Sequence, residues 1–115
     1  MTIRASANTS LDTNKAFAVT WAGLLNGDTG APVRMSQYSD KSVQVLGTFG
    51  AGGNLRWEGS NDGTNWAVLT DPQGNDLNFA TAKIEAVTEA VAWVRPNVTA
   101  GDGTTNLTVV ALLKE

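Results

Sequence analysis

Large apolar residues alternate with small or polar residues in several short stretches of the chain. Phe17, Val19 and Trp21 follow this period of two, which places their side chains on one face of a β-strand. Residues 42–49 and residues 107–113 have the spacing and composition of strands as well. These stretches predict a protein built from β-strands.

Clusters of Gly, Asn, Asp and Pro separate the alternating stretches. They lie at residues 26–28, 50–53, 61–64, 71–76 and 100–104. An Asp-Gly step such as Asp62-Gly63 favours a turn with positive φ, as hairpins require. Short strands at this regular spacing predict an all-β fold, an antiparallel β-sandwich or small barrel of about seven short strands, jelly-roll-like or immunoglobulin-like.

The domain organisation follows from where the alternation begins. Residues 14–115 contain all the predicted strands and are expected to form a single β-sandwich domain. Residues 1–13 show no periodicity, which predicts an extended N-terminal arm that is disordered or ordered by a neighbour. Ile3, Arg4 and Leu11 in this arm are therefore candidate partner contacts.

Two segments of the chain allow more than one interpretation. Residues 80–92 are rich in Ala, and the spacing of Ile84, Val87 and Val91 also suits a short amphipathic helix. Residues 93–99 have the composition of a strand, but Pro96 lacks the backbone N–H that a sheet ladder needs. We expect this strand to lie at a sheet edge or to contain a bulge.

The composition excludes several kinds of chemistry. The 115 residues include no histidine and no cysteine, so the usual general base, the thiol nucleophile and the commonest zinc ligands are missing. We expect no enzymatic activity, no catalytic residues, no cofactor and no metal site. The net charge is −3 and the eight basic residues are scattered, which argues against nucleic acid as a partner. The longest apolar stretch, residues 16–25, is too short to span a membrane.

Several acidic side chains are of the types that bind calcium or catalyse glycoside hydrolysis. Residues 61–65 carry oxygen donors for calcium but do not follow the order of an EF-hand loop, so a plain turn is the favoured interpretation. Asp71, Asp76, Glu85 and Glu89 include the two carboxylates that glycoside hydrolysis requires, but sequence spacing does not fix their separation. A solvated surface is the favoured interpretation for them.

Four tryptophans are many for a chain of this length. Three of the four are in phase with other large apolar residues of their strands, which favours a role in the core. The alternative is a platform on which sugar rings stack. The tryptophans are Trp21, Trp57, Trp66 and Trp93.

Residues 39–79 and 93–112 resemble small structural proteins encoded in the head-gene regions of tailed bacteriophages. The resemblance is carried by the hairpin GSNDGTNW (residues 59–66), the turn TDPQGN (residues 70–75) and the hairpin RPNVTAGDGTT (residues 95–105), in that order. Residues 59–66 alone also resemble a hairpin of discoidin-type carbohydrate-binding modules.

The resemblance to phage proteins implies a β-sandwich that coats or cements a capsid. It implies that the chain binds the major capsid protein on the virion surface as a homo-oligomer, such as a trimer, after synthesis in the host cytoplasm. The discoidin-like hairpin keeps a glycan-binding module of a virion fibre or surface protein as an alternative. A tail or neck component with the same fold is a third interpretation, because one fold serves several functions.

Overall fold

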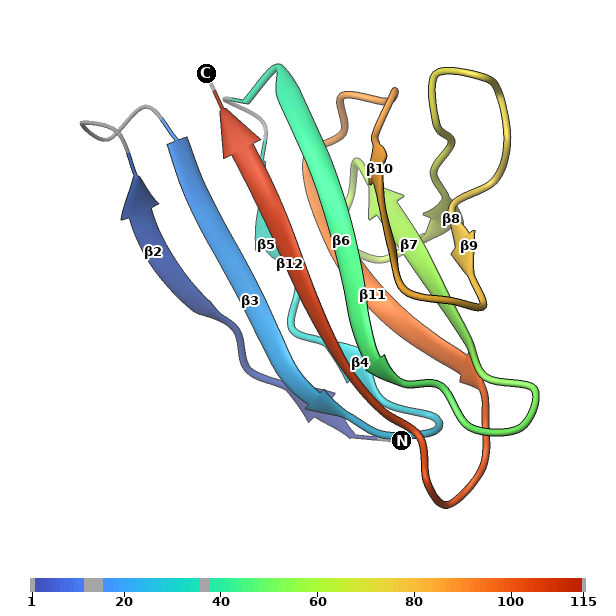
Figure 1. The fold of residues 1–115 in the computed structure, drawn as a ribbon. Helices are drawn as coiled ribbons and strands as arrows, with labels where there is room; N and C mark the ends of the chain where they lie inside the picture. The colour runs from blue at the N-terminus through green and yellow to red at the C-terminus, as the bar shows by residue number, and fades with distance from the viewer. Residues whose placement is uncertain (1, 12–15, 36–37, 115) are drawn as a thin grey trace.

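The computed structural model describes residues 2–11, 16–35 and 38–114, which form two β-sheets packed face to face (Figure 1). The five-stranded sheet contains β2 (Ala7–Leu11), β3 (Ala16–Leu24), β6 (Asp40–Thr48), β10 (Lys83–Ala86) and β12 (Asn106–Lys114). The seven-stranded sheet contains β1 (Ile3–Arg4), β4 (Thr29–Gly30), β5 (Val33–Arg34), β7 (Asn54–Ser60), β8 (Ala67–Val68), β9 (Asn78–Phe79) and β11 (Trp93–Ala100). The predicted all-β sandwich is confirmed.

The strand order explains how the sandwich is built. The five-stranded sheet has the order β10-β6-β12-β3-β2, and Figure 1 views it from its outer face. The seven-stranded sheet has the order β1-β4-β11-β7-β8, with β5 also on β11 and β9 also on β7. All pairings are antiparallel except that of β1 with β4. Seven strands have four or more residues and the other five have two, which accounts for the expected number of about seven.

Alternating residues of both sheets meet in one hydrophobic core. Along β12, Leu107, Val109, Ala111 and Leu113 point inward and are almost fully buried. Trp21 of β3 and Trp57 of β7 lie at the centre, with their rings 5.7 Å apart in an edge-to-face arrangement. The indole Nε1 of Trp21 donates a hydrogen bond to the carbonyl oxygen of Ala31, 3.0 Å away, which satisfies the one polar atom of this ring.

Pro96 lies in β11, which is an interior strand of its sheet rather than an edge. On one side β11 pairs with β7, and on the other it pairs with β4 at Asn97 and with β5 at Trp93 and Val94. Pro96 therefore falls in the gap between two short partner strands, where no ladder hydrogen bond requires its missing N–H. A bulge does occur in β11, but between Val98 and Ala100.

The helix considered for residues 80–92 is wrong. Residues 83–86 form β10, which pairs with β6, and the described residues contain no helix. Ile84 is 60% exposed and Val87 is buried, so the residues that would form an apolar helix face do not share one environment. Pairing with the open edge of β6 outweighs the helix propensity of the alanines.

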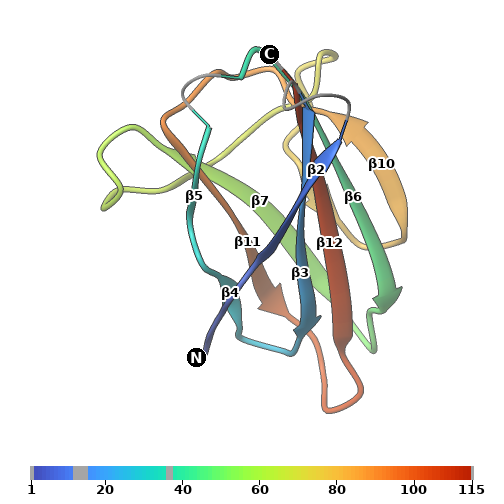
Figure 2. The same cartoon turned by 90° about the vertical axis from the view of Figure 1, so that its left-hand side faces the viewer.

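The N-terminal segment differs from the separate arm expected for residues 1–13. Ile3–Arg4 pair with β4 and Ala7–Leu11 pair with β3, so strands of the same chain order this segment. The segment passes from one sheet to the other across one open side of the sandwich (Figure 2). The physical reason is the edge of β3, whose backbone groups gain partners from β2. Residues 1, 12 and 13 of the expected arm lie outside the described residues.

Candidate functional site

The three candidate contact residues of the N-terminal segment differ in what they offer a partner. Ile3 is 63% exposed and Leu11 is 40% exposed, so both present apolar surface to solvent. Arg4 Nε lies 2.8 Å from Oδ2 of Asp28, a buried carboxylate. Burial favours a raised pKa for Asp28, but hydrogen bonds from the backbone N–H of Leu25 and from Arg4 outweigh it and lower the pKa. Arg4 therefore anchors β1 to the sandwich.

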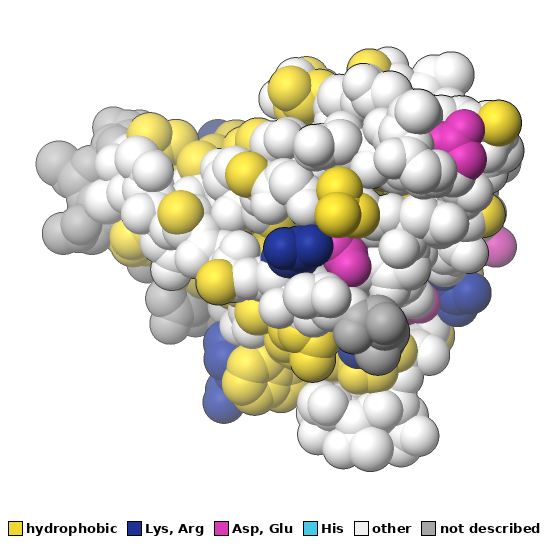
Figure 3. All heavy atoms as spheres, turned by 90° about the horizontal axis from the view of Figure 1, so that it is seen from below, with side chains coloured by type: hydrophobic (Ala, Val, Ile, Leu, Met, Phe, Trp, Pro, Cys, Tyr) yellow, Lys and Arg dark blue, Asp and Glu magenta, His cyan; other side chains and the backbone are white. Residues whose placement is uncertain are grey.

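Figure 3 shows the end of the sandwich near the N-terminus. Few charged side chains appear there, and hydrophobic side chains are scattered among polar and backbone atoms. Scattered apolar residues of this kind are normal for a protein surface. This end alone does not define a site.

The loop that carries oxygen donors for calcium is held by one carboxylate. Asp62 Oδ1 accepts hydrogen bonds from the backbone N–H groups of Thr64 and Asn65, each 2.8 Å away, and from Ser60 Oγ. These bonds strongly lower the pKa of Asp62. No group of three or more acidic residues in the described part of the chain is placed to hold a metal ion. Asp62 therefore serves as the cap of a turn, in which Gly63 adopts a φ of 77°.

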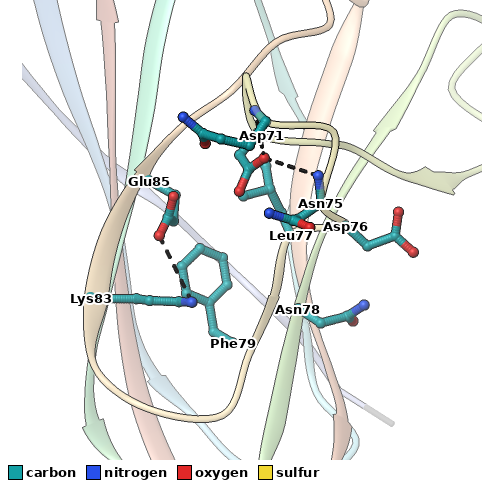
Figure 4. Close-up of a pocket in the computed structure, with 9 residues that line it drawn as sticks. Asp71, Asn75, Asp76, Leu77, Asn78, Phe79, Lys83 and Glu85 are labelled. Atoms are coloured by element: carbon teal, nitrogen blue, oxygen red, sulfur yellow. Dashed lines mark hydrogen bonds and ion pairs between the residues drawn. The ribbon is translucent and has the colours of Figure 1, made fainter.

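Three of the four carboxylates considered for acid/base chemistry line one pocket of about 310 Å³. The pocket lies between β10 and the loop of residues 71–79, and Lys83 and Glu85 project into it from the strand (Figure 4). Asp71, Asp76 and Glu85 share it with the amides of Gln73, Asn75 and Asn78.

Two of these carboxylates already have partners within the chain. Asp71 Oδ1 accepts backbone hydrogen bonds from Gln73 and Asn75, both 3.0 Å long, and Glu85 Oε1 lies 3.8 Å from Lys83 Nζ. The fourth, Glu89, instead accepts hydrogen bonds from the backbone N–H and the hydroxyl of Thr70. Asp71 and Glu89 therefore hold loops in place.

The outer face of the seven-stranded sheet gathers arginine and tryptophan, and we call it the Arg–Trp face. It consists of Arg34, Arg56, Glu58, Trp66, Trp93, Arg95 and Asn97. On β11, Trp93, Arg95 and Asn97 stand directly opposite Ser60, Glu58 and Arg56 of β7. Arg34 stands opposite Trp93 from β5. Strand register thus brings together basic residues that are scattered along the chain.

Glu58 is the centre of the Arg–Trp face. Its side chain is only 6% exposed, and its two oxygens lie 3.0 Å from Arg95 Nε and 3.1 Å from Arg56 Nε. Asn97 Nδ2 donates to the same carboxylate over 3.3 Å. A buried charge of this kind is stable only when paired and hydrogen-bonded.

The tryptophans divide between the core and this face. Trp21 and Trp57 are buried as expected, whereas Trp66 and Trp93 are only partly buried. Arg95 Cζ lies 4.2 Å from the ring centroid of Trp66, and Arg34 Cζ lies 5.0 Å from that of Trp93. These distances fit cation–π contacts, which fix the guanidinium groups. The expectation of three core tryptophans is therefore corrected to two.

Most of the outer face of the five-stranded sheet has the opposite character, and we call this part the uncharged face. It consists of Ala7, Thr9, Leu11, Ala18, Thr20, Ser42, Gln44, Leu46, Ile84, Ala86, Thr108, Val110 and Leu112, which stand opposite one another in register. None of these residues carries a charge, but Asp40 and Lys114, which are both exposed, stand opposite each other at one end of the same outer face. Leu11, Leu46 and Ile84 are exposed.

In the part of the chain that the structure describes, there is no helix that could span a lipid bilayer. A comparison with protein-family models and with curated proteins finds no match for this chain. The function must therefore be argued from its surfaces.

Proposed function

We propose that this chain is a structural protein of a tailed-bacteriophage virion, a decoration or cement protein that binds the major capsid protein and stabilises the head. It is made in the host cytoplasm and acts at the capsid surface by binding alone. The uncharged face carries this proposal. A free surface normally mixes charges of both signs, whereas the buried core of a protein interface is depleted of charge.

We further propose that the uncharged face lies between copies of the chain in a homo-oligomer, with a trimer as the first expectation. Leu11, Leu46 and Ile84 supply exposed apolar area on it, and identical uncharged faces do not repel one another. Many copies on one lattice would add avidity, which compensates for a modest interface per subunit.

Particles of the phage from which the gene for this chain has been deleted provide the test. We expect the purified protein to sediment with these particles and to raise the temperature at which they release DNA. If the protein stays in the supernatant at every concentration, the proposal is wrong. Electron microscopy of labelled particles separates the head from the tail or neck, which is the third interpretation of the fold.

A glycan-binding module remains the second candidate, favoured by the partial exposure of Trp66 and Trp93. Aromatic faces stack on the apolar faces of sugars, but Arg95 and Arg34 each cover one face of these rings. A glycan array and acrylamide quenching of tryptophan fluorescence test this candidate together. The candidate is rejected if no glycan on the array binds and no glycan protects the tryptophans from quenching by acrylamide.

A further inference from the structure

The Arg–Trp face holds its guanidinium groups in place while leaving part of each group unused. Arg95 and Arg56 approach Glu58 through Nε, and Arg34 lies over the ring of Trp93. Within the described residues, no hydrogen bond is made by the terminal Nη atoms of these three arginines. Each arginine therefore retains the two-pronged edge that recognises a carboxylate.

Preorganisation lowers the cost of using these groups in binding. A free arginine loses much side-chain entropy when a partner immobilises it, but stacking on Trp66 and Trp93 has already restricted Arg95 and Arg34. Arginine and tryptophan are also among the residues most enriched at the positions that dominate binding energy in protein interfaces. The composition of this face therefore suits a protein partner.

The charge of this face indicates the chemistry of the partner. Three arginines and one glutamate lie here, although the chain as a whole has a net charge of −3. Asp62 lies in the adjoining loop and is ionised, but the three arginines still outnumber the two carboxylates of this region. Excess positive charge on one face of an acidic protein favours an acidic surface as its complement.

Nucleic acid fits this face less well than a carboxylate-bearing protein does. Affinity for DNA or RNA grows with the number of phosphates neutralised, and Glu58 offsets part of the charge of only three arginines. Carboxylates spaced along a protein surface need only a few directed guanidinium contacts.

We infer that the Arg–Trp face docks on a carboxylate-rich surface of the capsid lattice protein. The inference rests on the proposed virion function, and it assigns to this face the contact with the lattice. Arg34 and Arg56 make this contact from the exposed part of the face, while Glu58 and the two tryptophans position the cluster.

Sedimentation with decoration-free particles tests the inference through Arg34→Glu and Arg56→Glu. Arg34 is exposed and stacks on Trp93, so reversal of its charge is compatible with folding. Arg56→Glu places a second carboxylate beside the buried Glu58, so its urea midpoint is measured together with its binding. We expect each reversal to weaken particle binding by about tenfold or more, and wild-type binding to fall as salt increases. Lys83→Glu makes the same change of charge on β10, outside this face, and should bind within about threefold of wild type.

The possible outcomes separate the inference from the function on which it rests. If wild type does not bind the particles, the virion function fails and the inference fails with it. If wild type binds and the arginine variants bind equally well, the function stands and the inference is overturned. An equal loss in Lys83→Glu also overturns it, because net charge would then explain the effect.

Two further measurements identify a different occupant or a folding defect. If light scattering shows an oligomer that Arg34→Glu dissociates, the occupant of this face is a second copy of the chain. If a DNA fragment binds and Arg34→Glu abolishes this binding, the occupant is nucleic acid. Either result shows that the inference is wrong. Arg34→Gln and Arg56→Gln, with urea midpoints equal to that of wild type, repeat the test without introducing a negative charge. Retained binding in both overturns the inference.

Discussion

Arg95 binds Glu58 through its edge and Trp66 through its face. Its Nε lies 3.0 Å from Glu58 Oε1, while its Cζ lies 4.2 Å from the ring centroid of Trp66. Because Arg95 and Glu58 are register partners on neighbouring strands, the ion pair also fixes β11 against β7. One buried carboxylate thus contributes both to the stability of the seven-stranded sheet and to the arrangement of its outer face.

Glu58→Gln should destabilise the fold measurably. The amide retains the shape of the carboxylate but loses the negative charge that pairs with Arg56 and Arg95. We expect a loss of about 1.5–3 kcal/mol in the free energy of unfolding, the range for hydrogen bonds to charged groups. Urea denaturation measures it. Glu85→Gln is the matched control, because the Glu85–Lys83 contact is 3.8 Å long and more exposed, and its loss should cost less than about 0.5 kcal/mol. Equal losses in the two variants would contradict the prediction.

Gly30→Ala should destabilise the protein through overpacking. A Cβ at Gly30 would lie 2.6 Å from Cδ and Cγ of Pro96 and 2.6 Å from Cδ1 of Trp21, in the closely packed region between the sheets. We expect a loss of about 1–3 kcal/mol in the free energy of unfolding. Gly103→Ala is the control, since a Cβ there meets no atom within 4 Å, and the substitution should change stability by less than about 0.5 kcal/mol. A stable Gly30→Ala variant would show that the packing around Pro96 yields easily.

The architecture could be predicted largely because its longest strands alternate strongly. The spacing of Val109, Ala111 and Leu113 places them on the buried face of β12, and the Asp-Gly turns lie where the chain reverses. The strand of residues 83–86 could not be predicted, because it depends on the open edge of β6, a partner about forty residues away. The same holds for Ala7–Leu11, which has no apolar alternation and is ordered by backbone pairing with β3.

The candidate site was harder to predict than the fold. Arg34, Arg56 and Arg95 come from three strands, and only the register of those strands brings them together. One local signal existed: Val94, Pro96 and Val98 alternate with Trp93, Arg95 and Asn97, and the two sets must face opposite sides of β11. Following that period of two would have assigned Trp93 to the surface beside Arg95.

Asp102 should make the free energy of unfolding depend on pH in the acidic range. Its carboxylate accepts hydrogen bonds from the hydroxyl and the N–H of Thr104 and from the N–H of Ala51, which lower its pKa from 3.8 to about 2. The folded state therefore favours the ionised carboxylate. The resulting stabilisation is fully present above pH 3.8, the ordinary pKa of the group, and it is lost as the pH falls through the pKa of about 2 that Asp102 has in the folded protein.

Asp102→Asn tests this dependence. We expect the variant to have a lower urea midpoint than wild type near neutral pH, and the difference to shrink between pH of about 4 and about 2. Asp76→Asn is the control, because no side-chain hydrogen bond or ion pair of Asp76 occurs among the described residues. A difference between wild type and Asp102→Asn that is constant over this pH range would contradict the prediction.

Ile84→Lys should reduce self-association if the uncharged face lies between copies. Ile84 is 60% exposed on β10 and stands beside Gln44, so a lysine there introduces a charge without disturbing the core. Burying that charge in an interface has a large cost, and we expect the dissociation constant of the oligomer to rise by about tenfold or more. Light scattering after gel filtration, over a range of protein concentrations, measures the change. Thr64→Lys, in the exposed loop of residues 61–65, is the control and should leave the oligomer intact. A wild-type protein that remains monomeric at the highest concentration, or equal weakening by both substitutions, would show that this face does not join copies of the chain.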